Sequence, residues 1–130
     1  MTYEWRSHTA EVELAIEAAS AEQVFEDAAA AFAELVAPHD GTAARYEVAL
    51  EAADRASLLV DWLEELIFLA DSEGFVAERA ADLRLTATAL AATLVGRHAT
   101  FEPLVKAATY HGLELARRGE VWHARVVLDV

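Results

Sequence analysis

The sequence predicts an α+β protein in which two helices pack on one face of a mainly antiparallel β-sheet, forming two layers. Segments that alternate between apolar and polar residues surround two segments whose apolar residues recur at helical spacing. The chain has 130 residues with 55% hydrophobic character, enough to bury one core but too few for two domains. We therefore expect a single domain over residues 1–130.

The first two elements are predicted strands joined by a turn. Residues 3–6 form a short strand by composition, and residues 7–10 form the connection. Residues 11–17 alternate strictly between glutamates and apolar residues, apart from one alanine. That pattern is typical of a half-buried strand with carboxylates on its outer face.

The first helix has clear start and stop signals. Ser20, with Gln23 three residues later, is a capping-box signature, and Pro38 ends the apolar stripe that follows. Residues 39–42 have the composition of a turn, and residues 45–51 alternate as a strand.

The second helix is the more apolar one and is expected to be the more deeply packed. Either Asp54 or Ser57 opens it, and Gly74 can adopt the left-handed conformation that ends a helix. Acidic residues of both helices fall largely outside the apolar stripes, so they are expected to be solvated. They are Glu22, Glu26, Asp27, Glu34, Glu64 and Glu65.

The second half of the chain is predicted to be mainly strand. The expected elements are a strand at 75–86 interrupted near residues 81–82, a strand at 91–95 closed by Gly96, a loop at 97–103, and final strands on either side of a turn at 117–119. The last of these runs to Val130, so we expect an ordered strand at the end of the chain rather than a polar tail.

The charge and composition restrict the partners. The net charge is −13, and because lysine and arginine bind phosphate backbones, a surface this acidic repels naked nucleic acid. We expect contact with nucleic acid only through another protein. The chain has no cysteine, no leader pattern and no charge-free stretch long enough to span a membrane. A cytoplasmic protein is expected.

The common enzyme motifs are absent from the sequence. There is no glycine-rich phosphate loop and no nucleophile elbow. The five histidines lack the spacing of a zinc site, and most are expected to be structural. His8 and His111 are better acid–base candidates because each lies beside an aromatic or carboxylate-bearing strand.

Two carboxylates stand apart from the solvated ones. Glu11 and Asp129 each lie at the end of a predicted strand with apolar neighbours. If those ends are adjacent, the two side chains converge with the α-carboxylate of Val130. Their mutual repulsion would favour a hard divalent cation, for which oxygen ligands are suited.

Four segments of the chain together resemble the archease family. They are residues 7–12, 58–66, 106–113 and 124–130. The resemblance implies a small α+β protein that is not itself a ligase. It assists the GTP-dependent RNA ligase of tRNA splicing and RNA repair by promoting guanylylation of the ligase and multiple turnover.

The resemblance also implies a metal site. Its ligands are Glu11, Asp129 and Val130, and the ion is Ca²⁺ in the family, with Mg²⁺ or Mn²⁺ as alternatives. Glu11 stands where the family typically carries aspartate, one methylene shorter. His8, His111 and Lys106, the only lysine of the chain, are expected to support the site.

Two other functions are kept as alternatives. An acidic surface over a large apolar core also suits a chaperone or a general interaction module, which would act without a metal. A small metal-dependent hydrolase using His8 or His111 would turn over a substrate alone. The expected partner under the leading hypothesis is the ligase protein, with no membrane.

Overall fold

The computed structural model describes residues 2–8, 11–102 and 104–130, with the side chains of residues 7 and 8 outside that description. Seven strands and two helices are present in the described chain. In order they are β1 (Thr2–His8), β2 (Glu11–Ala18), α1 (Ala21–Val36), β3 (His39–Glu51), α2 (Arg55–Glu73), β4 (Phe75–Leu85), β5 (Ala89–Thr100), β6 (Ala107–Arg118) and β7 (Val121–Asp129).

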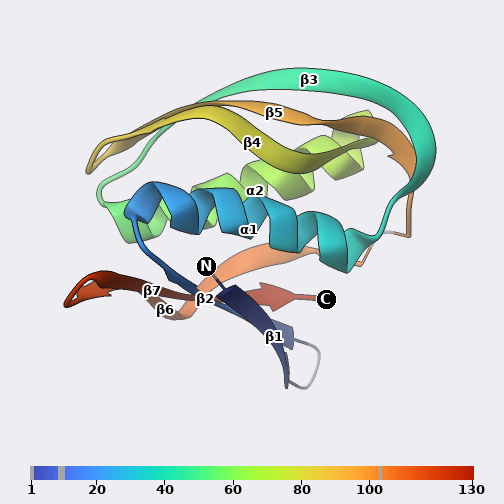
Figure 1. Ribbon diagram of the computed structural model, residues 1–130. Coiled ribbons are helices and arrows are strands. Elements are labelled where there is room, and N and C mark those ends of the chain that lie inside the picture. Colours follow the sequence, from blue (N-terminus) through green and yellow to red (C-terminus); the bar gives the residue numbers. More distant parts are fainter. Residues whose placement is uncertain (1, 9–10, 103) are drawn as a thin grey trace.

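The α+β class is confirmed, but the layering differs from the prediction of one sheet with both helices on one face. The strands form a four-stranded sheet, β1-β2-β7-β6, and a three-stranded sheet, β3-β5-β4. Both are antiparallel. Figure 1 shows the helices lying between the two sheets, so that the molecule has three layers.

The composition of the helices explains why two sheets are needed. Helix α2 has 19 residues, and the buried ones include three in succession, Leu58, Leu59 and Val60, which point to different sides of the helix. A helix that is apolar around most of its circumference must be covered on more than one side. The buried side chains form one cluster that draws on both helices and both sheets.

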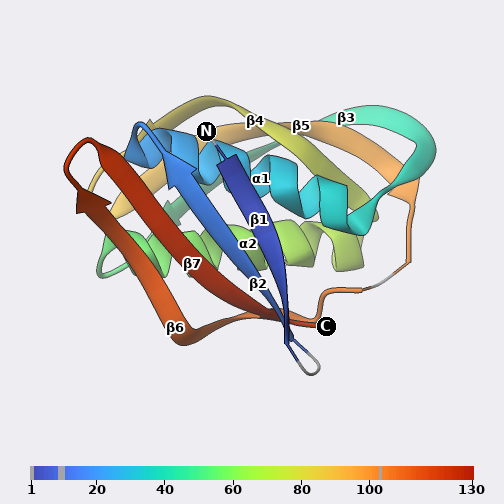
Figure 2. The same ribbon diagram turned by 60° about the horizontal axis from the view of Figure 1, so that its bottom comes forward.

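The four-stranded sheet joins the two ends of the chain. Strand β2 pairs on one side with β1 and on the other with β7, and β6 forms the opposite edge. Figure 2 shows these strands running side by side. The predicted strand at the end of the chain is therefore confirmed, and its neighbour comes from the beginning.

The predicted helix caps are confirmed. The Ser20 hydroxyl accepts the backbone N–H of Gln23 at 3.1 Å, and Asp54 accepts the N–H of Ser57 at 2.8 Å. Gly74 ends α2 with φ at 65°. These caps satisfy backbone donors and acceptors that a helix leaves unpaired.

The predicted turn at 39–42 is wrong, because β3 already begins at His39. Asp40 and Gly41 have positive φ values of 57° and 102°, and the register with β5 shifts between His39 and Thr42. The turn-forming residues thus make a bulge that bends the strand without ending it.

Gly96 was expected to close a strand, and that prediction is also wrong. Strand β5 continues to Thr100, into the predicted loop at 97–103. A Cβ atom on Gly96 would lie 2.0 Å from the Val76 carbonyl oxygen. Glycine is needed there because the neighbouring strand approaches closely. The expected interruption of β4 is confirmed by a register shift between Ala81 and Arg84.

Candidate functional site

The candidate site lies on the outer face of the four-stranded sheet, away from the helices. Side chains alternate across a sheet, and the inner set, which includes Leu14, Val126 and Leu128, is buried in the core. Glu11 and Asp129 belong to the alternate set. Their strands β2 and β7 are central in the sheet, which fixes the position of both carboxylates.

The antiparallel register places Glu11 directly opposite Asp129. Residues paired in this way have Cβ atoms about 5 Å apart, so the two side chains leave the sheet together. The juxtaposition expected from the sequence is present. Both residues are partly exposed, and like charges in directly opposed positions are destabilising. A cation between these carboxylates would relieve their repulsion.

Val130 follows Asp129 directly, and Lys106 touches the same residue through its backbone. The N–H of Lys106 donates to the Asp129 carbonyl oxygen at 2.8 Å, and the next residue, Ala107, pairs with Asp129 in the register of β6 and β7. The backbone of Lys106, the only lysine of the chain, therefore lies beside Asp129, and its side chain is exposed.

The two histidine candidates differ in their placement. His8 is the register partner of Glu11 on the side of β1, although its side chain lies outside the described part. His111 lies four residues beyond Ala107 on β6, roughly 13 Å along an extended strand, in the segment where the register with β7 shifts. The backbone thus brings His8 next to the pair and sets His111 apart.

The two carboxylates suit a hard divalent ion that takes its remaining ligands from other oxygen atoms. Among the described side chains, no group of three His, Cys, Asp or Glu residues is arranged to hold a metal. Two carboxylates alone would leave most of the coordination sphere to main-chain oxygen atoms, such as those of Val130, to water or to a partner. Calcium and magnesium accept such mixed oxygen ligands.

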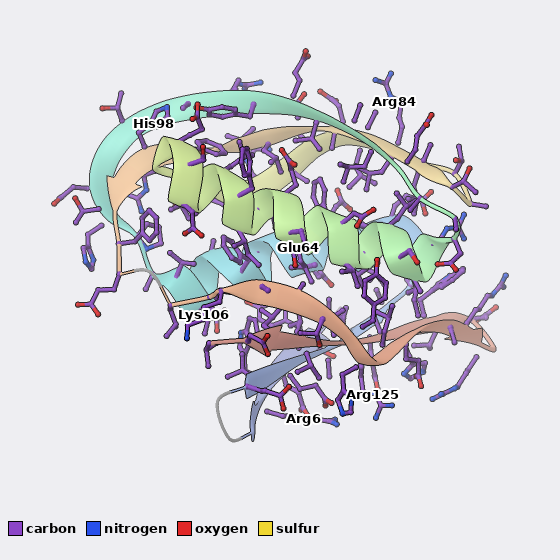
Figure 3. All side chains as sticks on the ribbon, turned by 180° about the vertical axis from the view of Figure 1, so that it is seen from behind. Arg6, Glu64, Arg84, His98, Lys106 and Arg125 are labelled. Carbon is purple, nitrogen blue, oxygen red and sulfur yellow. The ribbon has the colours of Figure 1, made fainter. Side chains whose placement is uncertain are left out.

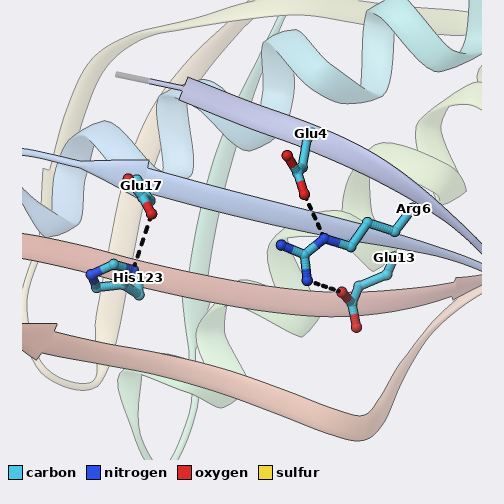
Figure 4. A network of polar contacts seen from close by, with 5 residues as sticks. All are labelled: Glu4, Arg6, Glu13, Glu17 and His123. Atoms are coloured by element: carbon cyan, nitrogen blue, oxygen red, sulfur yellow. Dashed lines mark hydrogen bonds and ion pairs between the residues drawn. The ribbon is translucent and has the colours of Figure 1, made fainter.

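An ion-pair network occupies the next row of the same face. Figure 4 shows Arg6 between Glu4 and Glu13, with contacts of 2.5 and 3.2 Å. Hydrogen bonding to Glu4 is the main cause that raises the pKa of Arg6. Within the described side chains, neither Glu11 nor Asp129 forms an ion pair. The guanidinium group of Arg6 therefore lies in the row next to Glu11 and Asp129 but pairs with other carboxylates.

Further down the face lies a shallow groove of about 620 Å³. Glu114 holds both Arg118, at 3.0 Å, and Arg125, at 3.6 Å, and His123 faces Glu17 at 3.7 Å. The groove does not reach the Glu11–Asp129 pair. Its charged side chains neutralise one another, which is common on a solvated sheet face.

Glu64 is a residue whose role the sequence did not reveal. It was expected to be solvated, but its carboxylate accepts the backbone N–H of Ala108 at 2.8 Å. Because Ala107 pairs with Asp129, this bond ties α2 to the part of β6 beside the site. No sequence signal marks it, since it depends on how α2 lies over β6.

The sequence and the structure were compared with known proteins. The model of the Archease protein family matches residues 3–130. The protein archease of Methanosarcina barkeri is 34% identical over 98% of this chain and 95% of its own length. The protein archease of Methanothermobacter thermautotrophicus is 35% identical over 84% of this chain and 84% of its own length.

Two solved structures share the fold. The solution structure of Methanobacterium thermoautotrophicum protein 1598 has a TM-score of 0.69 and 28% identity, and covers 98% of each chain. The crystal structure of a Thermotoga maritima protein, described as an archease and possible chaperone, also has a TM-score of 0.69, with 25% identity, over 100% of this chain and 98% of that one. Within the described residues, no helix is long and apolar enough to cross a membrane.

Proposed function

This chain belongs to the archease family, and on that premise we propose that it is a cytoplasmic accessory protein of the GTP-dependent RNA ligase of tRNA splicing and RNA repair. It promotes guanylylation of the ligase and multiple turnover, and does not join RNA ends itself. A divalent ion held by Glu11, Asp129 and Val130 is part of this activity.

The register of β2 and β7 is the observation that carries the proposal. It sets Glu11 opposite Asp129 on a face without helices, next to the backbone of Lys106. A divalent ion bound there supplies positive charge that can neutralise phosphate oxygens. The role of the chain is to fix two carboxylates on rigid central strands, so that the ion is presented in one position.

The side chains around the pair have supporting roles under this proposal. Lys106 can donate to an anion that approaches the ion, since its side chain is exposed. Arg6 holds Glu13 in an ion pair, which keeps the neighbouring carboxylate from adding a third negative charge to the pair. His8 is the register neighbour of Glu11.

The charge of the protein supports a protein partner. A net charge of −13 disfavours direct contact with RNA but favours docking on a basic, RNA-binding surface of a ligase. The ligase would then hold the RNA while this protein positions the ion near the GTP phosphates.

The test replaces Glu11 or Asp129 by alanine. Binding of Mn²⁺ should be lost in calorimetry, and guanylylation of the ligase with labelled GTP should return to the level without this protein, while the circular dichroism spectrum is unchanged. Glu11→Asp should retain stimulation. Glu17→Ala is the matched control, since Glu17 lies on the same strand and face. Undiminished stimulation by both alanine variants would falsify the metal role.

A chaperone role is the second candidate, because the Thermotoga maritima protein is described in those terms. It predicts that this protein suppresses aggregation of unrelated unfolded clients in the presence of a chelator. The same alanine variants separate the two functions, since holding unfolded clients does not need the carboxylate pair.

A further inference from the structure

The two sheets have four edge strands, which differ in how far they are protected. Strands β1 and β6 form the edges of the four-stranded sheet, and β3 and β4 form those of the three-stranded sheet. An edge strand presents unpaired backbone N–H and C=O groups, to which a strand of another molecule can bind. Short edge strands, bulges, proline and covering side chains are the usual protection against this.

Strands β4 and β6 are protected by irregularities. The register of β4 with β5 shifts twice along the strand. The register of β6 with β7 shifts between Thr109 and Glu114, and the Glu64 carboxylate accepts the backbone N–H of Ala108. Shifts of this kind bend a strand and disrupt its line of backbone donors and acceptors. Neither edge therefore offers a long, regular set of backbone groups.

The edge of β3 is regular. With 13 residues β3 is the longest of the described strands, and after its initial bulge it pairs with β5 without a shift over residues 42–51. This stretch, which we call the β3 edge, contains no proline, glycine or lysine. Figure 3 shows β3 passing near His98 along the margin of its sheet. Among the described strands, none pairs with its other side.

The side chains of the β3 edge alternate between two environments. One set contacts the core and includes Val48, which is buried, but three apolar members near the open edge stay partly exposed: Ala44, Tyr46 and Leu50. A further strand on this edge would cover them, which is favourable. The other set is exposed to solvent and consists of Ala43, Arg45, Glu47, Ala49 and Glu51.

Two charged residues of the exposed set are available to a partner. Arg45 and Glu47 are opposed on β5 by the uncharged Val95 and Thr93. Neither forms an ion pair with another side chain in the part of the chain that the structure describes. Opposite charges placed directly across an antiparallel pair are stabilising, and like charges are destabilising.

The order of these charges makes the β3 edge complementary to itself. When two copies pair in antiparallel orientation about a two-fold axis at Tyr46, Arg45 of each copy faces Glu47 of the other, and Ala43 faces Ala49. A slip of two residues in either direction would place Arg45 opposite Arg45 or Glu47 opposite Glu47. A slip of one residue would exchange the buried and the exposed side chains. One register is therefore favoured.

We propose that this protein forms a homodimer through the β3 edge. Two copies pair in antiparallel orientation over residues 42–51, so that two three-stranded sheets become one continuous sheet with two reciprocal ion pairs between Arg45 and Glu47. The interface is isologous, as in most protein dimers. Backbone hydrogen bonds supply most of the affinity, and the charges select the register and exclude unlike partners.

The edge strand β1 has a similar order of charges but is a poorer candidate. Its arginine, Arg6, already pairs with Glu4 on its own strand and with Glu13 on β2. The strand is also shorter, with seven residues. Pairing through β1 would require these ion pairs to break, whereas pairing through β3 breaks none that the structure describes.

The dimer goes beyond the proposed function and does not depend on the ligase. Figure 1 shows the two sheets on opposite sides of the helices, and Glu11 and Asp129 belong to the sheet that does not contain β3. Pairing through β3 therefore leaves both candidate sites accessible. Each copy carries a net charge of −13, so long-range repulsion opposes association at low ionic strength. Salt at about 0.15 M, where the Debye length is about 8 Å, screens that repulsion.

The experiment measures association of the full-length protein by analytical ultracentrifugation at about 0.15 M salt. The unaltered protein should show a reversible equilibrium between monomer and dimer. Arg45→Glu and Glu47→Arg each place like charges opposite one another at both symmetric positions, and each should raise the dissociation constant by about tenfold or more. An equimolar mixture of the two variants should associate again, because every opposed pair then has opposite charges.

Two matched controls separate this interface from others. Glu51→Arg makes the same change in net charge on the same face of β3, but residue 51 faces Gly41 of the other copy, so the dissociation constant should stay nearly unchanged. Glu4→Arg makes that change on β1 and should also have little effect. Loss of the dimer in Glu4→Arg would assign the interface to β1 and overturn the proposal.

Cross-linking tests the register. The chain has no cysteine, so each introduced thiol is the only one. In a mixture of Ala43→Cys and Ala49→Cys, a short bis-maleimide should join the two chains, because residues opposed across strands are about 5 Å apart. Neither variant alone should cross-link, since each position lies roughly 20 Å from the same position in the other copy.

The outcomes decide the proposal without reference to ligase activity. A chain that remains monomeric at every accessible concentration overturns it. So does a dimer that both charge variants leave intact, or cross-linking of position 43 to itself. A mixture of the charge variants that fails to associate also overturns it, provided that each variant has the circular dichroism spectrum of the unaltered protein. Arg45 and Glu47 are exposed on an edge strand, so both variants should fold.

Discussion

The two sheets cover the same helices but differ in what they present to solvent. On the four-stranded sheet, charged residues face each other across strands, as in Glu11 with Asp129 and Glu17 with His123. On the three-stranded sheet the charged residues of β3 are paired with uncharged ones, as in Glu47 with Thr93 and Glu51 with Ala89. Among the registered pairs of the described residues, two carboxylates oppose each other only on the four-stranded sheet, where the site is proposed.

The sheets also differ in which parts of the chain they join. The four-stranded sheet pairs the first strands with the last two, whereas the three-stranded sheet is built from residues 39–51 and 75–100. The candidate site therefore forms only when the two ends of the chain meet. Changes in the shared helical layer should affect both sheets, and changes within one sheet should affect that sheet first.

The largest effect is expected from Trp62→Ala. Trp62 is fully buried in α2, packs edge-on against Phe25 at 6.3 Å, and donates its indole N–H to the Phe25 carbonyl oxygen at 2.9 Å. A cavity of this size costs about 3–5 kcal/mol of unfolding free energy. Urea denaturation followed by circular dichroism measures it, and hydrogen exchange should show faster opening of both sheets.

The control for that experiment is Trp62→Phe, which keeps most of the volume and should lose less stability. Faster hydrogen exchange in only one sheet would show that the helices do not couple the two sheets. The prediction that changes in the helical layer affect both sheets would then be wrong.

A smaller effect, confined to one sheet, is expected from Gly96→Ala. The new Cβ would meet the Val76 carbonyl oxygen at 2.0 Å, so the backbones of β5 and β4 must separate. Overpacking of this kind typically costs about 1–3 kcal/mol. The unfolding free energy should fall accordingly, while Mn²⁺ binding at Glu11 and Asp129 stays the same. Loss of the metal together with stability would mean that the two sheets are not separable.

Gly96 also shows where the sequence is informative and where it is not. A glycine that follows an apolar run, as Gly96 does, predicts a special backbone position. It does not show whether the strand ends there or whether another strand comes close. Close approach is a property of the neighbouring strand, which local pattern does not contain. The same holds for Glu64, whose partner Ala108 is brought to it only by the packing of α2 on β6.

Features that depend only on residues close in sequence were predicted correctly. The caps at Ser20 and Asp54 depend on residues within three positions, and the alternation of residues 11–17 fixes which side of β2 is buried. Alternation does not show which strands share a sheet, so the division into two sheets was missed. The sequence predicted that Glu11 and Asp129 would converge if the ends of their strands were adjacent. The register of β2 and β7 places these ends side by side.

Ser20→Ala tests the junction between the four-stranded sheet and α1. Ser20 follows β2 and accepts the N–H of Gln23, so its loss leaves a helix donor unpaired. The expected cost is about 1 kcal/mol of unfolding free energy, measured by urea denaturation. Ser20→Asn should restore most of it, because asparagine caps as well as serine. An alanine variant as stable as the unaltered protein would mean that water replaces the cap at no cost.

Asp54 makes the corresponding junction between the three-stranded sheet and α2, and here the cap is a carboxylate. The hydrogen bond from the Ser57 backbone lowers the pKa of Asp54, helped by the Ser57 side chain. A carboxyl group with a lowered pKa in the folded state stabilises the fold above its unfolded pKa, and that contribution is lost as the pH falls through the folded value.

The smallest effect is therefore a difference in pH dependence between the two junctions. Asp54→Ser keeps a capping oxygen but removes the titration. The stability advantage of the unaltered protein over this variant should be constant from pH 7 to about 5 and should shrink below about pH 4, where carboxyl groups of this kind protonate. Ser20→Ala, compared in the same way, should differ from the unaltered protein by a constant amount, because the hydroxyl does not titrate. Equal pH slopes for both pairs would show that the Asp54 cap acts through its shape and not its charge.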